Sequence, residues 1–371
     1  MKRGRKPWTR DTPPALTAIR NMMNLFSFSY PNVWDALRQS ELPIVLYGMG
    51  NGADKVLDAF EKYHIKTYGV MASDDFCRYQ EFRGFTVKKQ SDFERELGDF
   101  IVALCFGSSL PEVTAHILEV AKTHIVLVPN VPVVGDVLMD EDFIRRYHED
   151  IERAYTLLTD EQSRKVFKGA LSFYYTGRLE FLTAIESDKD EVFRDILRLN
   201  NENYLDLGAY RGDTVDEFLY YCQNYRHITA VEPNPKNYQK LTQHIENLEN
   251  AFALNAGIAG RVTTMRISKK AGRMPTLGDE DGIEIPVTTV DEIDCQPTYI
   301  KIDIEGMESE MLSGAEHTLR AYKPKLNLAA YHRTEDFFEL ILQLHEINSA
   351  YNIYLRKHPY IPCWDLNIYA I

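Results

Sequence analysis

Residues 204–214 have the sequence Tyr204-Leu205-Asp206-Leu207-Gly208-Ala209-Tyr210-Arg211-Gly212-Asp213-Thr214, an apolar run that enters a glycine-containing turn. The pattern predicts a strand, a turn and the start of a helix, and the glycines allow the backbone to pass close to a ligand at the helix N-terminus. A second predicted strand, 227–231, ends at Glu232. This acid follows the turn by roughly twenty residues, where a carboxylate can accept hydrogen bonds from both hydroxyls of a ribose. The chain therefore contains half of a predicted nucleoside site.

Two kinds of nucleoside fit this spacing, a dinucleotide and the adenosine of S-adenosylmethionine. A dinucleotide turn is expected to have the pattern G-x-G-x-x-G, whereas Gly208 and Gly212 are four residues apart and follow Asp206. A carboxylate suits a cationic sulfonium better than a diphosphate, so the sequence favours S-adenosylmethionine. The alternative is a turn whose glycines are only structural, with Thr214 and Glu217 as a helix capping box.

The composition is that of a globular protein large enough for two domains. The chain has 371 residues, of which 44% are hydrophobic and 26% are charged, and chains of this length usually form more than one core. The net charge of -13 argues against general nucleic-acid binding, which requires a basic surface. A basic arm at residues 1–7 is the local exception, and we interpret it as a solvated tail.

Cysteine usage and hydropathy predict a cytoplasmic protein. The five cysteines are far apart in the sequence and form no C-x-x-C pair, a usage typical of reduced thiols. The N-terminal region lacks the apolar segment of a signal peptide, and no apolar run is as long as a membrane span. We therefore expect no membrane partner.

A second strand-turn-helix unit occurs near the N-terminus. The predicted strand 42–47 enters a turn in which Gly48, Gly50 and Ala53 occupy the three positions of a dinucleotide fingerprint, and Asp74 follows the next predicted strand. The unit is similar to the small Rossmann-like domains of sugar-modifying enzymes, which either bind a nucleotide sugar or act as a scaffold. These four residues are therefore a candidate second nucleotide site.

The chain divides into four predicted parts. They are an N-terminal arm and helix at 1–39, a small parallel α/β domain at 40–139, a helical connector at 140–200 and a second α/β domain at 201–371. A Gly- and Asp-rich segment at 270–282 interrupts the second domain, and it is either a solvated hairpin or a lid.

The predicted fourth strand of the second domain, 299–306, alternates isoleucine with Lys301, Asp303 and Glu305. Strands of a parallel sheet are usually covered on both faces and almost continuously apolar, and an isolated buried charge costs several kcal/mol. We therefore expect these charges to be paired or to face a cavity at the carboxyl end of the strand, where α/β sheets bind ligands. An edge strand with one solvated face is the alternative.

Four ordered motifs in this domain resemble the FkbM family of S-adenosylmethionine-dependent methyltransferases. They are Asp-Leu-Gly-Ala-Tyr-Arg-Gly-Asp-Thr, Val-Glu-Pro-Asn-Pro, Thr-Val-Asp-Glu-Ile and Ile-Lys-Ile-Asp-Ile-Glu-Gly-Met-Glu. The resemblance covers roughly residues 201–371 and implies an α/β fold with a seven-stranded Rossmann-like methyltransferase sheet, preceded here by the smaller parallel domain. It also implies O-methylation of a hydroxyl on a sugar or a related small-molecule or glycan acceptor, which the first domain could present in nucleotide-linked form.

The resemblance and the charged strand together define the candidate site. The cofactor-binding residues are predicted to be Asp206, Gly208, Ala209, Gly212, Asp213, Thr214, Glu232, Asn234 and Asn255. Asp303, Glu305 and His332 are the candidate catalytic residues, and His332 is the provisional base because an imidazole titrates near neutral pH. No residue is assigned to a metal.

Two other functions stay open from the sequence. A NAD-dependent oxidoreductase or epimerase of nucleotide sugars would use the Gly48 turn, although the first domain lacks a Tyr-x-x-x-Lys pair after its strands. A non-enzymatic nucleotide sensor would use either nucleoside site, although the charge density at 301–308 favours an enzyme. No oligomeric state is predicted.

Overall fold

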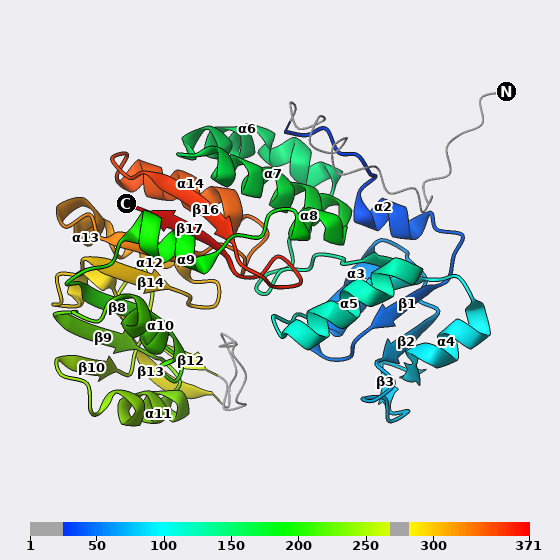
Figure 1. Cartoon of the computed structure of the whole chain (residues 1–371), viewed down its shortest axis with the longest axis horizontal. Helices are drawn as coiled ribbons and strands as arrows, with labels where there is room; N and C mark the ends of the chain where they lie inside the picture. Colours follow the sequence, from blue (N-terminus) through cyan, green and yellow to red (C-terminus); the bar gives the residue numbers. More distant parts are fainter. Residues whose placement is uncertain (1–24, 268–281) are drawn as a thin grey trace.

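A computed structural model describes residues 25–267 and 282–371 and shows two large β-sheets joined by helices, with two smaller sheets beside them (Figure 1). The basic arm at residues 1–7 and residues 270–281 of the predicted loop lie outside the described residues. No helix in the described ranges has both the length and the apolar character to cross a membrane.

The N-terminal sheet has five parallel strands in the order β5-β2-β1-β6-β7. These are β1 (Ile44–Tyr47), β2 (Gly69–Ala72), β5 (Lys88–Lys89), β6 (Ile101–Leu104) and β7 (Ile125–Leu127), with a small hairpin of β3 (Glu81–Phe82) and β4 (Phe85–Thr86) beside them. Its helices are α2 (Val33–Arg38), α3 (Asn51–Lys62), α4 (Gln90–Leu97) and α5 (Pro111–Thr123). Strands β1 and β6 are buried along their whole length, as expected for short apolar strands covered on both faces.

A helical layer connects the two sheets. It contains α6 (Glu141–Leu157), α7 (Glu161–Thr176), α8 (Leu179–Thr183), α9 (Lys189–Glu191) and the π-helical segment η1 (Val192–Leu197). The apolar residues Phe143, Ile151 and Leu158 recur at helical spacing and are buried. One continuous hydrophobic cluster contains residues of α6, α7 and both sheets, so the core extends from one sheet to the other.

The C-terminal sheet has seven strands in the order β10-β9-β8-β14-β15-β17-β16, which confirms the predicted α/β methyltransferase architecture. The strands are β8 (Asn203–Leu207), β9 (His227–Val231), β10 (Ala251–Leu254), β14 (Tyr299–Ile302), β15 (Lys325–Ala329), β16 (Ile353–Lys357) and β17 (Leu366–Ala370), and β17 runs antiparallel to both neighbours. The helices are α10 (Asp213–Tyr221), α11 (Pro235–Ile245), α12 (Glu308–Ser313), α13 (Glu316–Ala321) and α14 (Asp336–Ile347). A separate three-stranded sheet contains β11 (Gly257–Ile258), β12 (Thr263–Ile267) and β13 (Ile283–Thr288), followed by the 3-10 turn η2 (Val290–Glu292).

The strand order determines where a ligand can bind. The chain leaves β8 for β9 on one side and later returns to β14 on the other side, so β8 is the point at which the direction of winding reverses. In open α/β sheets, ligands bind in the crevice at the carboxyl ends of the strands at such a point. The turn at Gly208 and the charged segment after Ile302 both lie at this crevice.

Candidate active site

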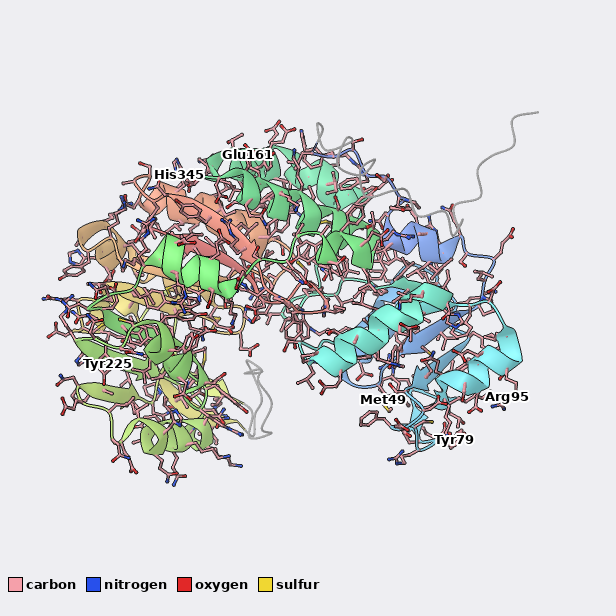
Figure 2. All side chains as sticks on the ribbon, viewed as in Figure 1. Met49, Tyr79, Arg95, Glu161, Tyr225 and His345 are labelled. Carbon is pink, nitrogen blue, oxygen red and sulfur yellow. The ribbon has the colours of Figure 1, made fainter. Side chains whose placement is uncertain are left out.

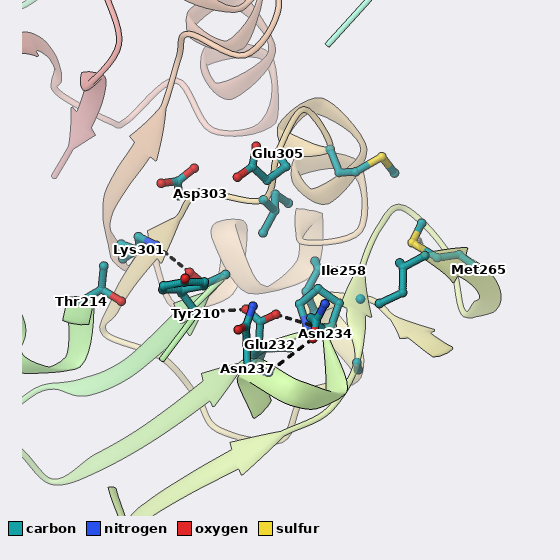
Figure 3. A pocket seen from close by; sticks show the side chains of 18 of the residues that line it. Tyr210, Thr214, Glu232, Asn234, Asn237, Ile258, Met265, Lys301, Asp303 and Glu305 are labelled. Carbon is teal, nitrogen blue, oxygen red and sulfur yellow. Dashed lines mark hydrogen bonds between the residues drawn. The ribbon is translucent and has the colours of Figure 1, made fainter. Parts of the chain in front are cut away.

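A cavity of about 220 Å³ lies at the carboxyl ends of β8, β9 and β14 (Figure 3). Of the residues predicted from the sequence, the wall contains Gly208, Asp213, Thr214, Glu232, Asn234, Lys301, Asp303 and Glu305. Residues that the sequence did not single out complete the wall, and they include Tyr210, Asn237, Met265 and Tyr331. The cavity therefore brings the predicted cofactor turn and the charged segment together.

Five of the predicted site residues do not line this cavity. Asp206 and Ala209 are fully buried beneath the turn, and Gly212 is the N-cap of α10. Asn255 anchors the turn after β9, because its side-chain amide donates to the carbonyl oxygens of Glu232 and Pro233 at 2.8 and 3.0 Å. His332, the fifth, lies behind Asp303 and Glu305. The position of a residue at a strand end predicted that it lies near the cavity. It did not predict whether its side chain faces the cavity or turns away from it.

Glu232 occupies the position of the predicted ribose acceptor. It is mostly buried, and its two carboxylate oxygens accept the backbone N–H groups of Tyr210 at 3.0 Å and Asn234 at 2.8 Å. Burial raises the pKa of Glu232, and these two hydrogen bonds partly oppose that rise. Each carboxylate oxygen keeps a lone pair for a further donor, so the side chain can accept ribose hydroxyls while it holds the turn.

Gly208 makes the close approach of the two ligand-binding loops possible. Its φ is +83°, and a Cβ at this position would lie 1.9 Å from the carbonyl oxygen of Asp303. No other residue type fits this conformation and this distance. The Gly208 carbonyl in turn accepts a hydrogen bond from Lys301 Nζ at 3.0 Å, so the turn is tied to β14.

Asp206 and Lys301 form a buried ion pair beneath the cavity. Asp206 has 0% exposure; its Oδ2 accepts from Thr214 Oγ1 at 2.5 Å, while its Oδ1 lies 3.6 Å from Lys301 Nζ. Burial raises the pKa of Asp206, and Lys301 and Thr214 oppose that rise. For Lys301, burial lowers the pKa, but the carboxylates of Asp206 and Asp303 outweigh it and raise the pKa. Lys301 is therefore held as a cation.

His332 lies in a cage of carboxylates, and only 1% of its surface is exposed. Its Nε2 is 3.3 Å from Asp303 Oδ1 and 3.7 Å from Glu305 Oε2, and its Nδ1 is 2.9 Å from Glu308 Oε1 without the alignment of a hydrogen bond. Burial lowers the pKa of His332, but Glu308, Asp303 and Glu305 outweigh it and raise the pKa to about 10. A protonated imidazole cannot accept a proton, which argues against the predicted base role of His332.

Asp303 and Glu305 lie beyond the end of β14 rather than within it. The strand ends at Ile302, and Glu305 has a φ of +56°, so the strict alternation expected for 299–306 stops before the two acids. Both nevertheless face the cavity, and the Tyr331 hydroxyl lies 3.3 Å from each carboxylate oxygen of Asp303 and donates to that group. The Asp303 side chain is 36% exposed, so a ligand can reach it.

Two further acids that sequence reasoning did not assign complete the cage around His332. Glu308 is buried and accepts the N–H of Ile304 at 3.0 Å, and Asp336 accepts the N–H of Arg333 at 2.7 Å. Burial and Glu308 raise the pKa of Asp336 to about 7, against the opposing effects of the Arg333 N–H and His332. Asp303, Glu308 and His332 also offer ligand atoms within 4.8 Å of one another, so a metal ion at this cluster would have to displace the His332 proton.

The candidate second nucleotide site is only partly assembled in the N-terminal domain. Gly50 lines a separate cavity of about 300 Å³, whereas the Gly48 turn packs against Phe106 and Ala53 is buried in the core. Asp74 does not line that cavity, and its carboxylate accepts the N–H of Ser91 at 3.2 Å. The predicted ribose acceptor of this domain is therefore directed elsewhere.

Comparisons with known proteins agree with the fold. Residues 206–357 match the Methyltransferase FkbM domain family. The structure is similar to that of the methyltransferase FkbM from Methylobacillus flagellatus KT, with a TM-score of 0.68, 21% sequence identity and coverage of 91% of this chain and 92% of that chain. No match to a curated protein was found.

Two more distant structural matches cover about half of the chain. Precorrin-6y C5,15-methyltransferase from Geobacter metallireducens GS-15 has a TM-score of 0.32 and 14% identity, with coverage of 50% of this chain and 91% of that chain. Fibrillarin from Aeropyrum pernix, in complex with S-adenosyl-L-methionine, has a TM-score of 0.31 and 14% identity, with coverage of 49% of this chain and 71% of that chain. The family match carries the assignment for this part of the chain: residues 206–357 form an FkbM methyltransferase domain, and methyltransferases of this family use S-adenosylmethionine.

Proposed function

We propose that this enzyme methylates a hydroxyl oxygen of a sugar or a related small-molecule or glycan acceptor. The observation that carries this proposal is the Asp303 carboxylate, which faces the cavity and is backed by the cationic His332. An alcohol loses its proton as its oxygen gains a methyl group, so the reaction needs an acceptor for that proton at the cavity. Asp303 supplies one.

The residues of the cavity fit S-adenosylmethionine. Glu232 offers carboxylate oxygens for a ribose, and Ile258, Met265 and Ile267 form an apolar wall suited to an adenine ring. The turn at Gly208 brings backbone close to the position between Glu232 and Asp303. When bound, the cofactor supplies an electrophilic methyl group on a sulfonium. The part of the wall that contains Asp303, Glu305 and Tyr331 is left for the acceptor.

Asp303 is assigned the base role, and His332 positions it. The protonated imidazole lies 3.3 Å from Asp303 Oδ1 and fixes the orientation of the carboxylate. The Tyr331 hydroxyl, which donates to the same carboxylate, restricts it further. Holding an oriented base beside the acceptor contributes roughly 10²–10⁴-fold in general acid–base catalysis. Glu305, beside Asp303, can accept a second hydroxyl of the acceptor and so orient it.

The charges around the cavity mouth favour a neutral polyhydroxylated acceptor. Asp303 and Glu305 are both acidic, and carboxylates accept hydrogen bonds from neighbouring hydroxyl groups while they repel phosphate. With a chain net charge of -13, a nucleic-acid partner is not proposed. A cytoplasmic location is part of the proposal, supported by five free cysteines.

An acceptor screen tests this function. The purified chain is incubated with methyl-labelled S-adenosylmethionine and a panel of sugars, nucleotide sugars and glycans, and products are identified by mass spectrometry and NMR. We expect a methyl ether on a hydroxyl oxygen, absent from the Asp303→Asn variant. Methylation of a nitrogen or carbon acceptor, with every hydroxyl acceptor inactive, would contradict the proposal.

A further inference from the structure

The second cavity, about 300 Å³ in volume, lies at the carboxyl ends of β1 and β6 in the N-terminal domain. Met49, which is labelled in Figure 2, is one of its lining residues. Strand β1 is followed by β2 on one side and later by β6 on the other, so this crevice is the winding reversal of the N-terminal sheet. The position is equivalent to that of the methyl-donor cavity in the C-terminal sheet. It is therefore a place where a ligand site is expected on topological grounds.

Gly50 has no packing reason to be a glycine. Its φ is +139°, and a Cβ built at this position meets nothing within 4 Å. In contrast, a Cβ on Gly52 would lie 2.3 Å from the Cys105 carbonyl oxygen, so Gly52 allows helix α3 to pack against β6. The backbone at Gly50 thus borders open space in the cavity. The second glycine of a dinucleotide fingerprint has the same role, because it lets the backbone approach the ligand.

The N-terminal end of α3 offers unused hydrogen-bond donors at this place. Among the described residues, no side chain caps this helix. The Asp54 N–H is the first in the helix to donate to a backbone acceptor, which is the Gly50 carbonyl at 2.9 Å. The N–H groups of Asn51, Gly52 and Ala53 precede it. Such groups, together with the helix dipole, favour an anionic ligand.

A mostly buried side chain without a hydrogen-bond partner gives independent support. Asn130 lines the cavity and is 8% exposed, yet its amide has no hydrogen-bond partner among residues 25–267 and 282–371. The residue lines the cavity, so a bound ligand could supply the partner of its amide. The loop that carries Asn130 is fixed in place, because Lys55 Nζ donates to the carbonyls of Pro132 and Val133 at 2.8 and 2.7 Å.

The methyltransferase domain closes the cavity with an aromatic side chain. Trp364, between β16 and β17, lines the cavity together with Phe106, and a Cβ on Gly107 would lie 2.6 Å from the Trp364 ring. Reciprocal backbone hydrogen bonds between Ser108 and Ile361, at 2.7 and 3.0 Å, hold the two loops together. Flat aromatic faces beside an anion site suit the ring of a nucleotide or sugar.

We propose that this crevice binds a small molecule with a phosphate or diphosphate group, which lies on the N-terminal end of α3 and contacts Asn130, while its ring lies against Trp364. Asp74 takes no part, since it does not line the cavity and accepts the Ser91 N–H instead. The ligand therefore extends from β1 toward β6 and β7 rather than toward β2. This site is independent of the methyl acceptor and of the base assignment at Asp303.

Calorimetric titration of the full chain with inorganic pyrophosphate and with UDP tests the proposal. Both probes should bind the wild type, and Asn130→Ala should weaken both by ~10-fold or more, because it removes a hydrogen bond to a charged group. Trp364→Ala should weaken UDP more than pyrophosphate, since only UDP has a ring. Asn352→Ala, at an exposed asparagine, is the matched control and should change neither affinity.

Titration with S-adenosylhomocysteine separates this proposal from the proposed function. Each variant should bind S-adenosylhomocysteine like the wild type, which also shows that the variant is folded. Absence of binding by both probes, or equal affinity in the wild type and Asn130→Ala, would overturn the phosphate site. Asn130-dependent binding of pyrophosphate in a chain that fails to bind S-adenosylhomocysteine would support the phosphate site and count against the methyltransferase function alone.

Discussion

Replacing Asp303 with asparagine separates proton acceptance from every other property of the site. The amide has nearly the same shape as the carboxylate and still fits beside Tyr331 and His332, but it accepts a proton far less readily. A positioned base contributes roughly 10²–10⁴-fold, so the turnover rate should fall by that factor, which corresponds to about 3–5.5 kcal/mol in the activation free energy.

The structure predicts that this loss is confined to the chemical step. Asp303 is 36% exposed and its pairing with His332 is screened by solvent, so the substitution should cost at most ~1 kcal/mol of folding free energy. His332 keeps Glu308 at 2.9 Å and Glu305 at 3.7 Å. The ribose acceptor Glu232 contacts Tyr210 and Asn234 rather than Asp303, so cofactor affinity should be unchanged.

The assay measures turnover, the affinity for S-adenosylhomocysteine and the melting temperature for the wild type, Asp303→Asn and Asp294→Asn. Asp294 is an exposed aspartate outside the cavity, and its substitution makes the same chemical change without touching the site. Wild-type turnover in Asp303→Asn, with both variants folded, would refute the base assignment. A parallel loss of cofactor affinity would instead identify Asp303 as a binding residue.

Four further predictions concern the other charged groups. Glu232→Gln should weaken S-adenosylhomocysteine binding in calorimetry by roughly tenfold or more, because hydrogen bonds to a charged group are worth about 1.5–3 kcal/mol each; unchanged affinity in a folded variant would remove the ribose assignment. Lys301→Met should lower the free energy of unfolding, measured by chemical denaturation, by about 3–5 kcal/mol, since it leaves Asp206 buried and unpaired. Adding Asp206→Asn to this variant should restore part of the loss. Strictly additive losses would show that the pair is not coupled. The imidazole of His332 should titrate near pH 10 in NMR. Because its pKa is raised on folding from 6.5 to about 10, its contribution to the free energy of unfolding should be fully present below pH 6.5 and should fall by up to ~1.4 kcal/mol per pH unit toward pH 10. A titration midpoint at or below 6.5 would return His332 to the base role. Chelation of divalent cations should leave turnover unchanged, because a protonated His332 already supplies the positive charge between Asp303 and Glu308, and lost activity that added metal restores would identify this cluster as a metal site.

The sequence predicted the framework of the site because glycine and strand patterns are local. The turn at Gly208 and the acid at Glu232 depend only on short-range backbone geometry and on the parallel pairing of β8 with β9, and both lie on the cavity as expected. Asp206 was predicted to face the ligand, but its side chain turns inward to Thr214 and Lys301. Strand-end position fixes the edge of the sheet at which a residue lies, whereas the direction of a side chain past the strand end depends on tertiary partners.

The role of His332 could not be read from the sequence for a related reason. Its pKa depends on Glu308, which is four residues beyond Ile304 and returns toward β15 only because the chain reverses at Glu305 and Gly306 with positive φ values. A regular strand through 299–306 would have carried Glu308 away from His332. The density of acids between Asp303 and Glu308 was the available signal, since carboxylates at a strand end are expected to be paired with a cation or to face a cavity.

One loop connects the two cavities, and its contacts join the N-terminal domain to the catalytic segment. The loop follows β7; Asn130 lines the phosphate site near its start, and farther along the Val134 N–H donates to the His332 carbonyl at 2.9 Å. The Val134 side chain covers Gly306, where a Cβ would lie 2.9 Å from Val134 Cβ. Only three residues lie between Asn130 and Val134, and Lys55 donates to the carbonyls of two of them, Pro132 and Val133. The backbone of His332, the residue that orients Asp303, is therefore held by the same short loop that carries Asn130, so the N-terminal domain is a structural component of the methyltransferase site.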